Sequence, residues 1–171
     1  MDRGGMTNRP KIDAIDARLL ERLQVDGRRA YADLGSDVGI SGPSAHERVK
    51  KLEARRVITG YAATVDPSAA GYPIVAFCWL TQSPGSAGAD LTDAFAAIDE
   101  IEECHHIAAE ADYLLKIRAR DTRHLEQVLI RLQATPHVFT TQTEVVLSSA
   151  FEHRPLRLLP TPGETGEARE P

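Results

Sequence analysis

The hydrophobic spacing of this chain changes from helix-like to strand-like near Gly60. Before that glycine, apolar residues recur at steps of three and four; after it, they form short runs between turn residues. A chain of 171 residues with 42% hydrophobic residues can bury one medium core or two small ones. We therefore expect an α+β chain of two small domains. The expected parts are a flexible N-terminus over residues 1–10, a helical domain over 11–61, a linker over 62–73, a second domain over 74–153 and a flexible tail over 154–171.

The net charge of -5 hides two surfaces of opposite sign. Residues 1–60 hold 12 Lys+Arg against 9 Asp+Glu, which gives +3, whereas residues 61–171 hold 8 against 16, which gives -8. The first domain could therefore approach a nucleic-acid phosphate, and the second would resist it.

The sequence shows no pattern typical of a membrane span, a secretion signal or a cysteine-based metal site. No apolar run is long enough to span a membrane and the N-terminus lacks a secretion signal, so we expect a cytoplasmic protein with no membrane partner. Cys78 and Cys104 lie inside apolar segments and not in a spaced framework. They are expected to be buried free thiols, with no disulfide, metal site or cofactor.

Two helices are predicted before Gly39. The first opens at Asp13 and carries an apolar stripe at helical spacing, formed by Ile12, Ile15, Leu19, Leu20 and Leu23. The second covers residues 31–38, with Leu34 and Val38 on its inner side. Gly39 then supplies the positive φ that a tight turn needs.

A third helix follows the turn, with Ser41 as its N-cap. Pro43 is tolerated in the first turn because the N–H groups there have no helical partner. The buried stripe is expected to consist of Ala45, Val49 and Leu52. This spacing is that of a helix-turn-helix, in a winged-helix-like domain, whose last helix can enter the major groove of DNA. A helix pair with a purely structural role is the alternative.

The side chains opposite the buried stripe are the predicted DNA contacts, starting at Ser41. We expect base edges to be met by Ser44, His46, Glu47 and Lys50. We expect the phosphate backbone to be held by Arg48, Lys51, Arg28 and Arg29. The basic run at the end of the helix also suits the negative end of its dipole, so a structural role for these cations remains open.

Glu47 lies at the centre of the predicted DNA-facing surface. Its carboxylate would repel phosphate, yet it could accept a hydrogen bond from cytosine N4 and so recognise a C·G pair. The alternative is an intrahelical ion pair with Lys50 or Lys51.

The second domain has the order βαββαβ of a ferredoxin-like fold. Strands are predicted over residues 74–80, 101–108, 113–119 and 138–147, and helices over residues 90–98 and 122–134. Two helices cover one face of a four-stranded antiparallel sheet, while the strand with Phe77 and Trp79 leaves apolar area on the other. Sheet-to-sheet dimerisation of two copies is the expected solution.

Several ordered motifs together resemble one family. They are Ile12-Asp13-Ala14-Ile15-Asp16, Gly39-Ile40-Ser41, Arg48-Val49-Lys50-Lys51-Leu52-Glu53, Val57-Ile58-Thr59-Gly60-Tyr61, Asp112-Tyr113-Leu114-Leu115-Lys116 and Thr141-Gln142-Thr143-Glu144-Val145-Val146-Leu147. Over roughly residues 11–151 the chain resembles the Lrp/AsnC (feast/famine) regulators. The resemblance implies a ligand-responsive transcription regulator that binds double-stranded DNA. It also implies homodimers that associate further, and a small effector, typically an amino acid, bound to the second domain.

The resemblance also implies an effector site around the loop that precedes Asp112. The residues it suggests are Ala109, Glu110, Asp112, Thr141 and Thr143. Threonine hydroxyls and loop N–H groups could hold a carboxylate, although threonine is also a common strand residue. The chain departs from the family pattern twice: Ala108-Ala109-Glu110-Ala111 replaces a loop that usually holds a glycine, and Glu47 stands where relatives commonly have arginine.

Two other functions fit parts of the sequence. Sirohaem decarboxylases resemble the same family, and His105 with His106 could serve such chemistry. Neighbouring strand residues point to opposite faces, however, so the pair cannot act together without a bulge, and we expect no enzymatic activity. The other alternative is a metabolite-binding oligomer that does not bind DNA.

Overall fold

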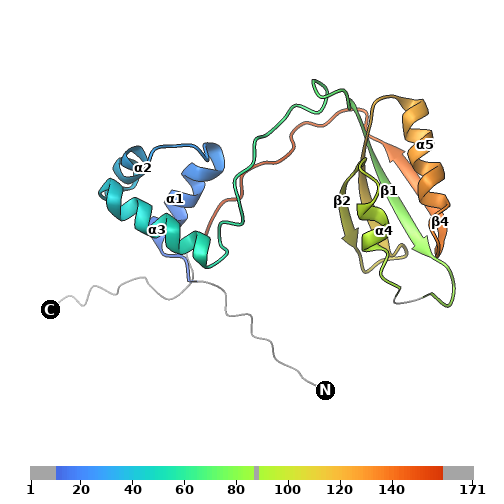
Figure 1. Ribbon diagram of the computed structural model, residues 1–171, viewed down its shortest axis with the longest axis horizontal. Helices are drawn as coiled ribbons and strands as arrows, with labels where there is room; N and C mark the ends of the chain where they lie inside the picture. Colours follow the sequence, from blue (N-terminus) through green and yellow to red (C-terminus); the bar gives the residue numbers. More distant parts are fainter. Residues whose placement is uncertain (1–10, 87–88, 160–171) are drawn as a thin grey trace, which may run out of the picture. The chain divides into compact units, whose positions relative to one another are not determined.

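The computed structural model describes residues 11–86 and 89–159 and separates them into two compact units (Figure 1). Of the described residues, 11–63 and 151–159 form one unit, and those between 64 and 150 form the other. The first is helical and the second is built on a sheet. Among the described residues, no helix is both long and apolar enough to cross a membrane.

Three helices form the first unit: α1 (Ala14–Val25), α2 (Tyr31–Val38) and α3 (Gly42–Ala54). Asp13 caps α1, as predicted, and its carboxylate accepts hydrogen bonds from the backbone N–H groups of Ile15 and Asp16. The core joins all three helices through Leu19, Leu34, Val38 and Ala45. Residues 55–73 form no strand, so the described part of this unit has three helices and no wing.

The turn between α2 and α3 is tight. Gly39 adopts the left-handed conformation with φ 79°, and the N–H of Ile40 donates to the carbonyl of Gly35 at 2.8 Å. A Cβ on Gly35 would lie 2.6 Å from the Ile40 carbonyl oxygen, which is closer than any real contact. Glycine at position 35 therefore lets the start of α3 approach α2.

The second unit is a four-stranded antiparallel sheet of order β2-β3-β1-β4. Its strands are β1 (Ile74–Gln82), β2 (Ile101–His106), β3 (Tyr113–Ala119) and β4 (Val138–Val145). The helices α4 (Thr92–Ala96) and α5 (Thr122–Gln133) complete the predicted βαββαβ order (Figure 1). The α+β class and the ferredoxin-like sheet are thus confirmed.

Both helices cover the same face of this sheet. Ala76, Cys78 and Leu80 of β1 are fully buried against Phe95 of α4 and Val128 of α5. The residues between them on β1 point the other way, so Phe77 and Trp79 remain partly exposed on the open face. Burying the first set, together with the apolar side chains of the two helices, stabilises this unit.

Element lengths differ from prediction at several ends. Helix α4 begins at Thr92 and not at residue 90, because the Asp90 carboxylate accepts from the Thr92 N–H in a turn before the helix. Strand β2 stops at His106, and β4 stops at Val145. The prediction that Cys104 is buried is wrong, because this residue is exposed on the edge strand β2, whereas Cys78 is buried.

Two parts of the chain are predicted from the sequence to be flexible. Residues 1–10, and 160–171 of the predicted tail, lie outside the described residues. Residues 154–159 of that tail are described, and the backbone of Leu156 is hydrogen-bonded to the side chain of Gln24 on α1. This part of the tail therefore packs with the helical unit.

Candidate functional site

Helix α3 is built to present one face outward. Ser41 caps it: its hydroxyl accepts from the Ser44 N–H at 3.3 Å, and Pro43 occupies the first turn. The buried stripe of Ala45, Val49 and Leu52 is the predicted one. The opposite side is exposed, and it carries Pro43, Ser44, Glu47, Lys50 and Lys51.

Not every predicted DNA contact lies on that exposed face. His46 is only partly exposed, and its ring packs on Tyr31 of α2 with 4.5 Å between ring centroids. Arg48 is directed toward α1, where it pairs with Asp13 and Asp16. The structure thus brings Ser44, Glu47, Lys50 and Lys51 together and gives His46 and Arg48 partners inside the unit.

The two arginines before α2 differ in their surroundings. The Arg29 guanidinium lies 2.8 Å from the Asp37 carboxylate, which also lies 3.3 Å from Arg22. Arg28 has an exposed side chain, and its backbone N–H donates to the carboxylate of Asp26. Of the two, Arg28 has the freer side chain.

Glu47 forms no ion pair with Lys50 or Lys51 within the described parts of the chain, so the intrahelical alternative is not observed. The carboxylate borders a surface hollow of about 550 Å³. The hollow is lined by Asp16, Pro43, Ser44, Glu47, Arg48, Lys51, Leu52 and Arg55. It therefore holds both carboxylates and cations beside the outward face of α3.

The predicted effector residues fall into a loop and a strand. Ala109 and Glu110 are exposed in the loop between β2 and β3. Asp112 closes that loop: its N–H donates to the Leu80 carbonyl at 2.9 Å, and its carboxylate accepts from the Gln82 N–H at 2.7 Å. Asp112 thus has a structural role at the end of β1.

Thr141 and Thr143 lie on β4 directly beside β1. Their pairing partners are Leu80 and Cys78, so both hydroxyls lie on the helix-covered side of the sheet. The Thr141 hydroxyl accepts from the Gln133 side chain of α5 at 3.0 Å. Since Asp112 also contacts Leu80, the sheet brings Asp112 and Thr141 to the two sides of one residue.

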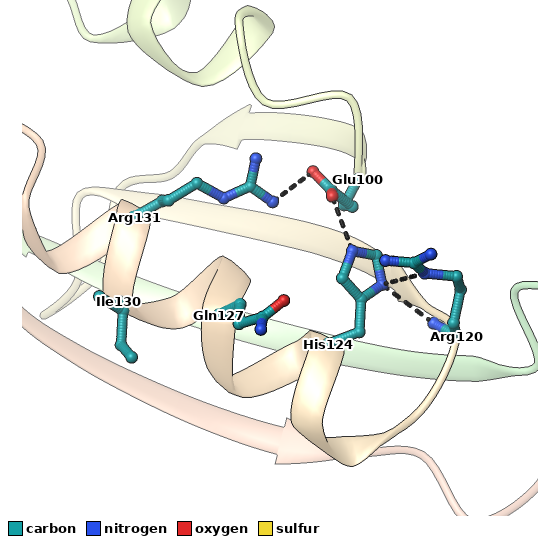
Figure 2. A pocket seen from close by; sticks show the side chains of 6 residues that line it. All are labelled: Glu100, Arg120, His124, Gln127, Ile130 and Arg131. Atoms are coloured by element: carbon teal, nitrogen blue, oxygen red, sulfur yellow. Dashed lines mark hydrogen bonds and ion pairs between the residues drawn. The ribbon is translucent and has the colours of Figure 1, made fainter.

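A charged cluster that sequence reasoning missed lies between α5 and the start of β2 (Figure 2). His124 is 7% exposed; its Nδ1 accepts from the Arg120 N–H at 3.2 Å, so its Nε2 donates to Glu100 at 2.9 Å. Arg131 holds the other Glu100 oxygen at 2.7 Å. Burial alone would raise the pKa of Glu100, but these contacts hold it below its ordinary value.

This cluster borders a hollow of about 410 Å³. The only local sequence signal for it is the spacing of Asp121 and His124, where the Asp121 carboxylate caps α5 by accepting from the His124 N–H. Glu100 lies 24 residues before His124, and spacing alone does not connect the two.

His105 and His106 point to opposite faces of the sheet. His105 pairs with Glu103 at 3.0 Å, whereas the ring of His106 stacks on Tyr113 with 4.9 Å between centroids. The bulge in β2 lies earlier, between Ile101 and Glu103, and does not bring the histidines together. The two rings cannot act as one acid–base pair, as the sequence predicted. No metal-binding group of three or more His, Cys, Asp or Glu side chains occurs among the described residues.

Comparison with known proteins agrees with this geometry. Residues 12–53 match the model of the AsnC-type helix-turn-helix domain, and residues 75–156 match that of the Lrp/AsnC ligand binding domain. The transcriptional regulator LrpA of Mycobacterium tuberculosis is 34% identical over 84% of this chain and 95% of its own length. The leucine-responsive regulatory protein of Haemophilus influenzae is 36% identical over 80% of this chain and 84% of its own.

Solved structures give the same relationship. A feast or famine regulatory protein from M. tuberculosis, complexed with L-methionine, superposes with a TM-score of 0.78 at 33% identity, covering 83% of this chain and 96% of that one. AsnC of Escherichia coli superposes with a TM-score of 0.77 at 28% identity, covering 86% and 99%. The chain therefore belongs to the Lrp/AsnC family of transcription regulators.

Proposed function

We propose that this regulator binds double-stranded DNA by inserting the exposed face of α3 into the major groove. The supporting observation is that face itself: a capped helix, anchored by Ala45 and Val49, whose outer side carries Ser44, Glu47, Lys50 and Lys51. In this proposal Arg28, which is exposed before α2, contacts the phosphate backbone of the DNA. A cytoplasmic location is part of this proposal, and a role on DNA supports it.

Selection from a random duplex library with the full-length protein, followed by gel-shift titration, tests this proposal. Lys50→Ala should weaken binding to the selected site, and affinity should fall steeply with salt because phosphate contacts release counterions. Arg123→Ala removes the same charge from an exposed position on α5 and should leave affinity unchanged. Failure of the full-length protein to enrich any sequence would exclude the proposal.

Glu47 is proposed to contact a base. A Glu47→Ala variant should then lose discrimination at one position of the selected site, because a cytosine N4–H loses its acceptor. A rise in affinity with unchanged specificity would instead mean that the carboxylate only repels phosphate.

We further propose that the second unit binds an amino acid or a related metabolite. Ala109, Glu110, Asp112, Thr141 and Thr143 would form the site, since loop and strand meet at the end of β1. The related M. tuberculosis protein was solved with L-methionine, which makes methionine the first probe.

Calorimetry across the standard amino acids tests the proposal, and Thr143→Val is the variant expected to bind more weakly. Absence of heat across the whole panel would count against it.

The open face of the sheet is proposed as a homodimer interface that permits further assembly. Phe77 and Trp79 leave apolar surface there that a second copy would cover. Sedimentation of Phe77→Lys should show smaller species than the unmodified protein. Ile130→Lys changes an apolar residue that is 59% exposed on α5 and should leave the assembly unchanged.

Catalysis is not part of the proposed function, since the relatives named above are regulatory proteins. A tetrapyrrole that remained bound through purification, visible as absorbance, would reopen the decarboxylase alternative.

A further inference from the structure

Arg48 is held between two carboxylates of another helix. One guanidinium nitrogen lies 2.6 Å from Asp13 Oδ2 and 2.8 Å from Asp16 Oδ1. The Asp16 side chain is 11% exposed, whereas those of Arg48 and Asp13 are 33% and 34% exposed, so the contact is partly screened from water. The contact joins the middle of α3 to the first turn of α1, 32 and 35 residues away in sequence.

The two carboxylates are themselves fixed. Asp13 is the N-cap of α1 and accepts from the N–H groups of Ile15 and Asp16, at 2.8 and 2.7 Å. The Asp16 carboxylate in turn accepts from the Asp13 N–H at 3.4 Å, which completes a capping box. The partner of Arg48 is therefore a rigid turn and not two mobile side chains.

Arg48 is poorly placed to neutralise a DNA phosphate. Two carboxylates against one guanidinium give this group a net charge of about -1, so a phosphate would meet repulsion there. If Arg48 swung outward, the buried Asp16 carboxylate would lose its cation, which is costly. Lys50 and Lys51 are exposed, and neither forms an ion pair within the described residues.

Because Arg48 lies in the middle of α3, its contact with Asp13 and Asp16 can affect the rotation of this helix about its own axis. Ala45, Val49 and Leu52 pack α3 against the core and resist rotation of the helix about its own axis. A charged contact with fixed geometry, one residue away from Val49, opposes such rotation. The direction in which Ser44 and Glu47 project depends on that rotation.

We infer that Arg48, Asp13 and Asp16 form an ion lock that sets the orientation of α3, and that Arg48 is a positioning residue instead of a phosphate contact. The inference rests on the proposed DNA binding by α3. In it, the sequence specificity of α3 depends on three residues that do not themselves contact DNA. It replaces the prediction from the sequence that Arg48 contacts the phosphate backbone of DNA.

The direction in which one substitution changes DNA affinity distinguishes a positioning role of Arg48 from a phosphate contact. Asp16→Asn keeps the size and the hydrogen-bond acceptor but removes one of the two negative charges that hold Arg48. If Arg48 positions α3, affinity for the selected site should fall by about tenfold while binding to unrelated DNA stays constant. If Arg48 contacts phosphate, the guanidinium has one competing carboxylate fewer, and affinity for both kinds of DNA should rise. Glu21→Gln makes the same charge change at an exposed site on α1 and serves as the control.

Salt dependence gives a second readout that loss of structure alone would not produce. Lys51→Met should reduce the slope of log affinity against log salt by about 0.9, the value for one lost phosphate contact. Arg48→Met should lower affinity for the selected site with the slope unchanged. A slope reduced as much as in Lys51→Met would overturn the inference.

A thermal double-mutant cycle tests the lock without DNA, so a failure of the proposed DNA binding is distinguishable from a failure of the lock. Arg48→Met and Asp16→Asn should each lower the melting temperature of the full chain, and the double variant should lose less than the two losses added together. Additive losses would mean that the residues do not act as one unit. Arg48→Lys, which keeps the charge, should restore part of both the melting temperature and the specificity.

Discussion

Gln24 binds both polar backbone groups of Leu156. Its side-chain Nε2 donates to the Leu156 carbonyl at 3.0 Å, and the Leu156 N–H donates to its Oε1 at 2.8 Å. One glutamine on α1 thus takes the place that a neighbouring strand would have in a sheet. The segment after β4, for which the sequence predicts flexibility from residue 154, is attached to the helical unit at this point.

Replacing Gln24 with Ala should release this attachment. Both hydrogen bonds are exposed, and each contributes about 0.5 kcal/mol, the low end of the usual range, so global stability should fall by about 1 kcal/mol. Amide exchange at Leu156 should nevertheless become much faster, because that N–H loses its acceptor. Hydrogen-exchange mass spectrometry is the measurement, with Glu21→Ala on the same helix as control. Unchanged exchange around Leu156 would show that the contact does not hold the segment in solution.

Two glycines of the helix turn should differ in their tolerance of alanine. Gly39 has φ 79° and open space where a Cβ would lie, so Gly39→Ala should cost only the backbone strain of about 1–2 kcal/mol. In Gly35→Ala the new methyl would meet the Ile40 carbonyl at 2.6 Å, and α2 and α3 would have to separate. Urea unfolding should therefore show a larger loss for Gly35→Ala. Equal losses would mean that the turn relaxes easily.

The contact between Arg48 and Asp13 should make the free energy of unfolding depend on pH in the acidic range. Burial alone would raise the pKa of Asp13, but hydrogen bonds from the Asp16 N–H and from Arg48 outweigh it and hold the pKa below 3.8. A carboxyl whose pKa is lower in the folded state contributes stability above its ordinary pKa and loses it as pH falls through the folded value. The unfolding free-energy difference between the unmodified protein and Asp13→Asn should thus be constant near neutral pH and shrink below 3.8. A difference that stays constant into strong acid would contradict the assignment.

The two cysteines should react at different stages of unfolding. Cys78 is fully buried, and burial raises the pKa of its thiol against a smaller opposing effect of the Thr143 contact. Cys104 is exposed on the edge strand β2. A thiol reagent at mildly alkaline pH should label Cys104 in the folded protein and Cys78 only after denaturation. Cys104→Ser should abolish the early labelling, and early labelling that survives this change would place Cys78 at the surface.

Local patterns predicted the elements whose formation depends on neighbouring residues. Helix α2 and strand β3 have the predicted bounds, and the caps at Asp13 and Ser41 are as expected. In each case the deciding contact spans only a few residues, which is why spacing alone reveals it.

The remaining features depend on contacts between distant segments. Spacing on α3 places Arg48 near the buried edge, but nothing local indicates that Asp13 and Asp16 would lie beside it. The same holds for Glu100, which finds His124 only after the sheet and α5 pack together. Thr141 and Thr143 are predicted ligand contacts, and only the β1–β4 register shows that they face α5.

The bulge in β2 has an effect on long-range electrostatics. It brings Glu102 and Glu103 within 3.1 and 3.2 Å of Lys116, and Glu102 also lies 2.8 Å from Arg118. Two anions and two cations cancel at this end of the open face. Beyond a Debye length of about 8 Å at physiological salt, another molecule would sense almost no field from these four groups. Approach to this part of the sheet is therefore neither accelerated nor slowed by them, and selectivity there depends on shape at contact.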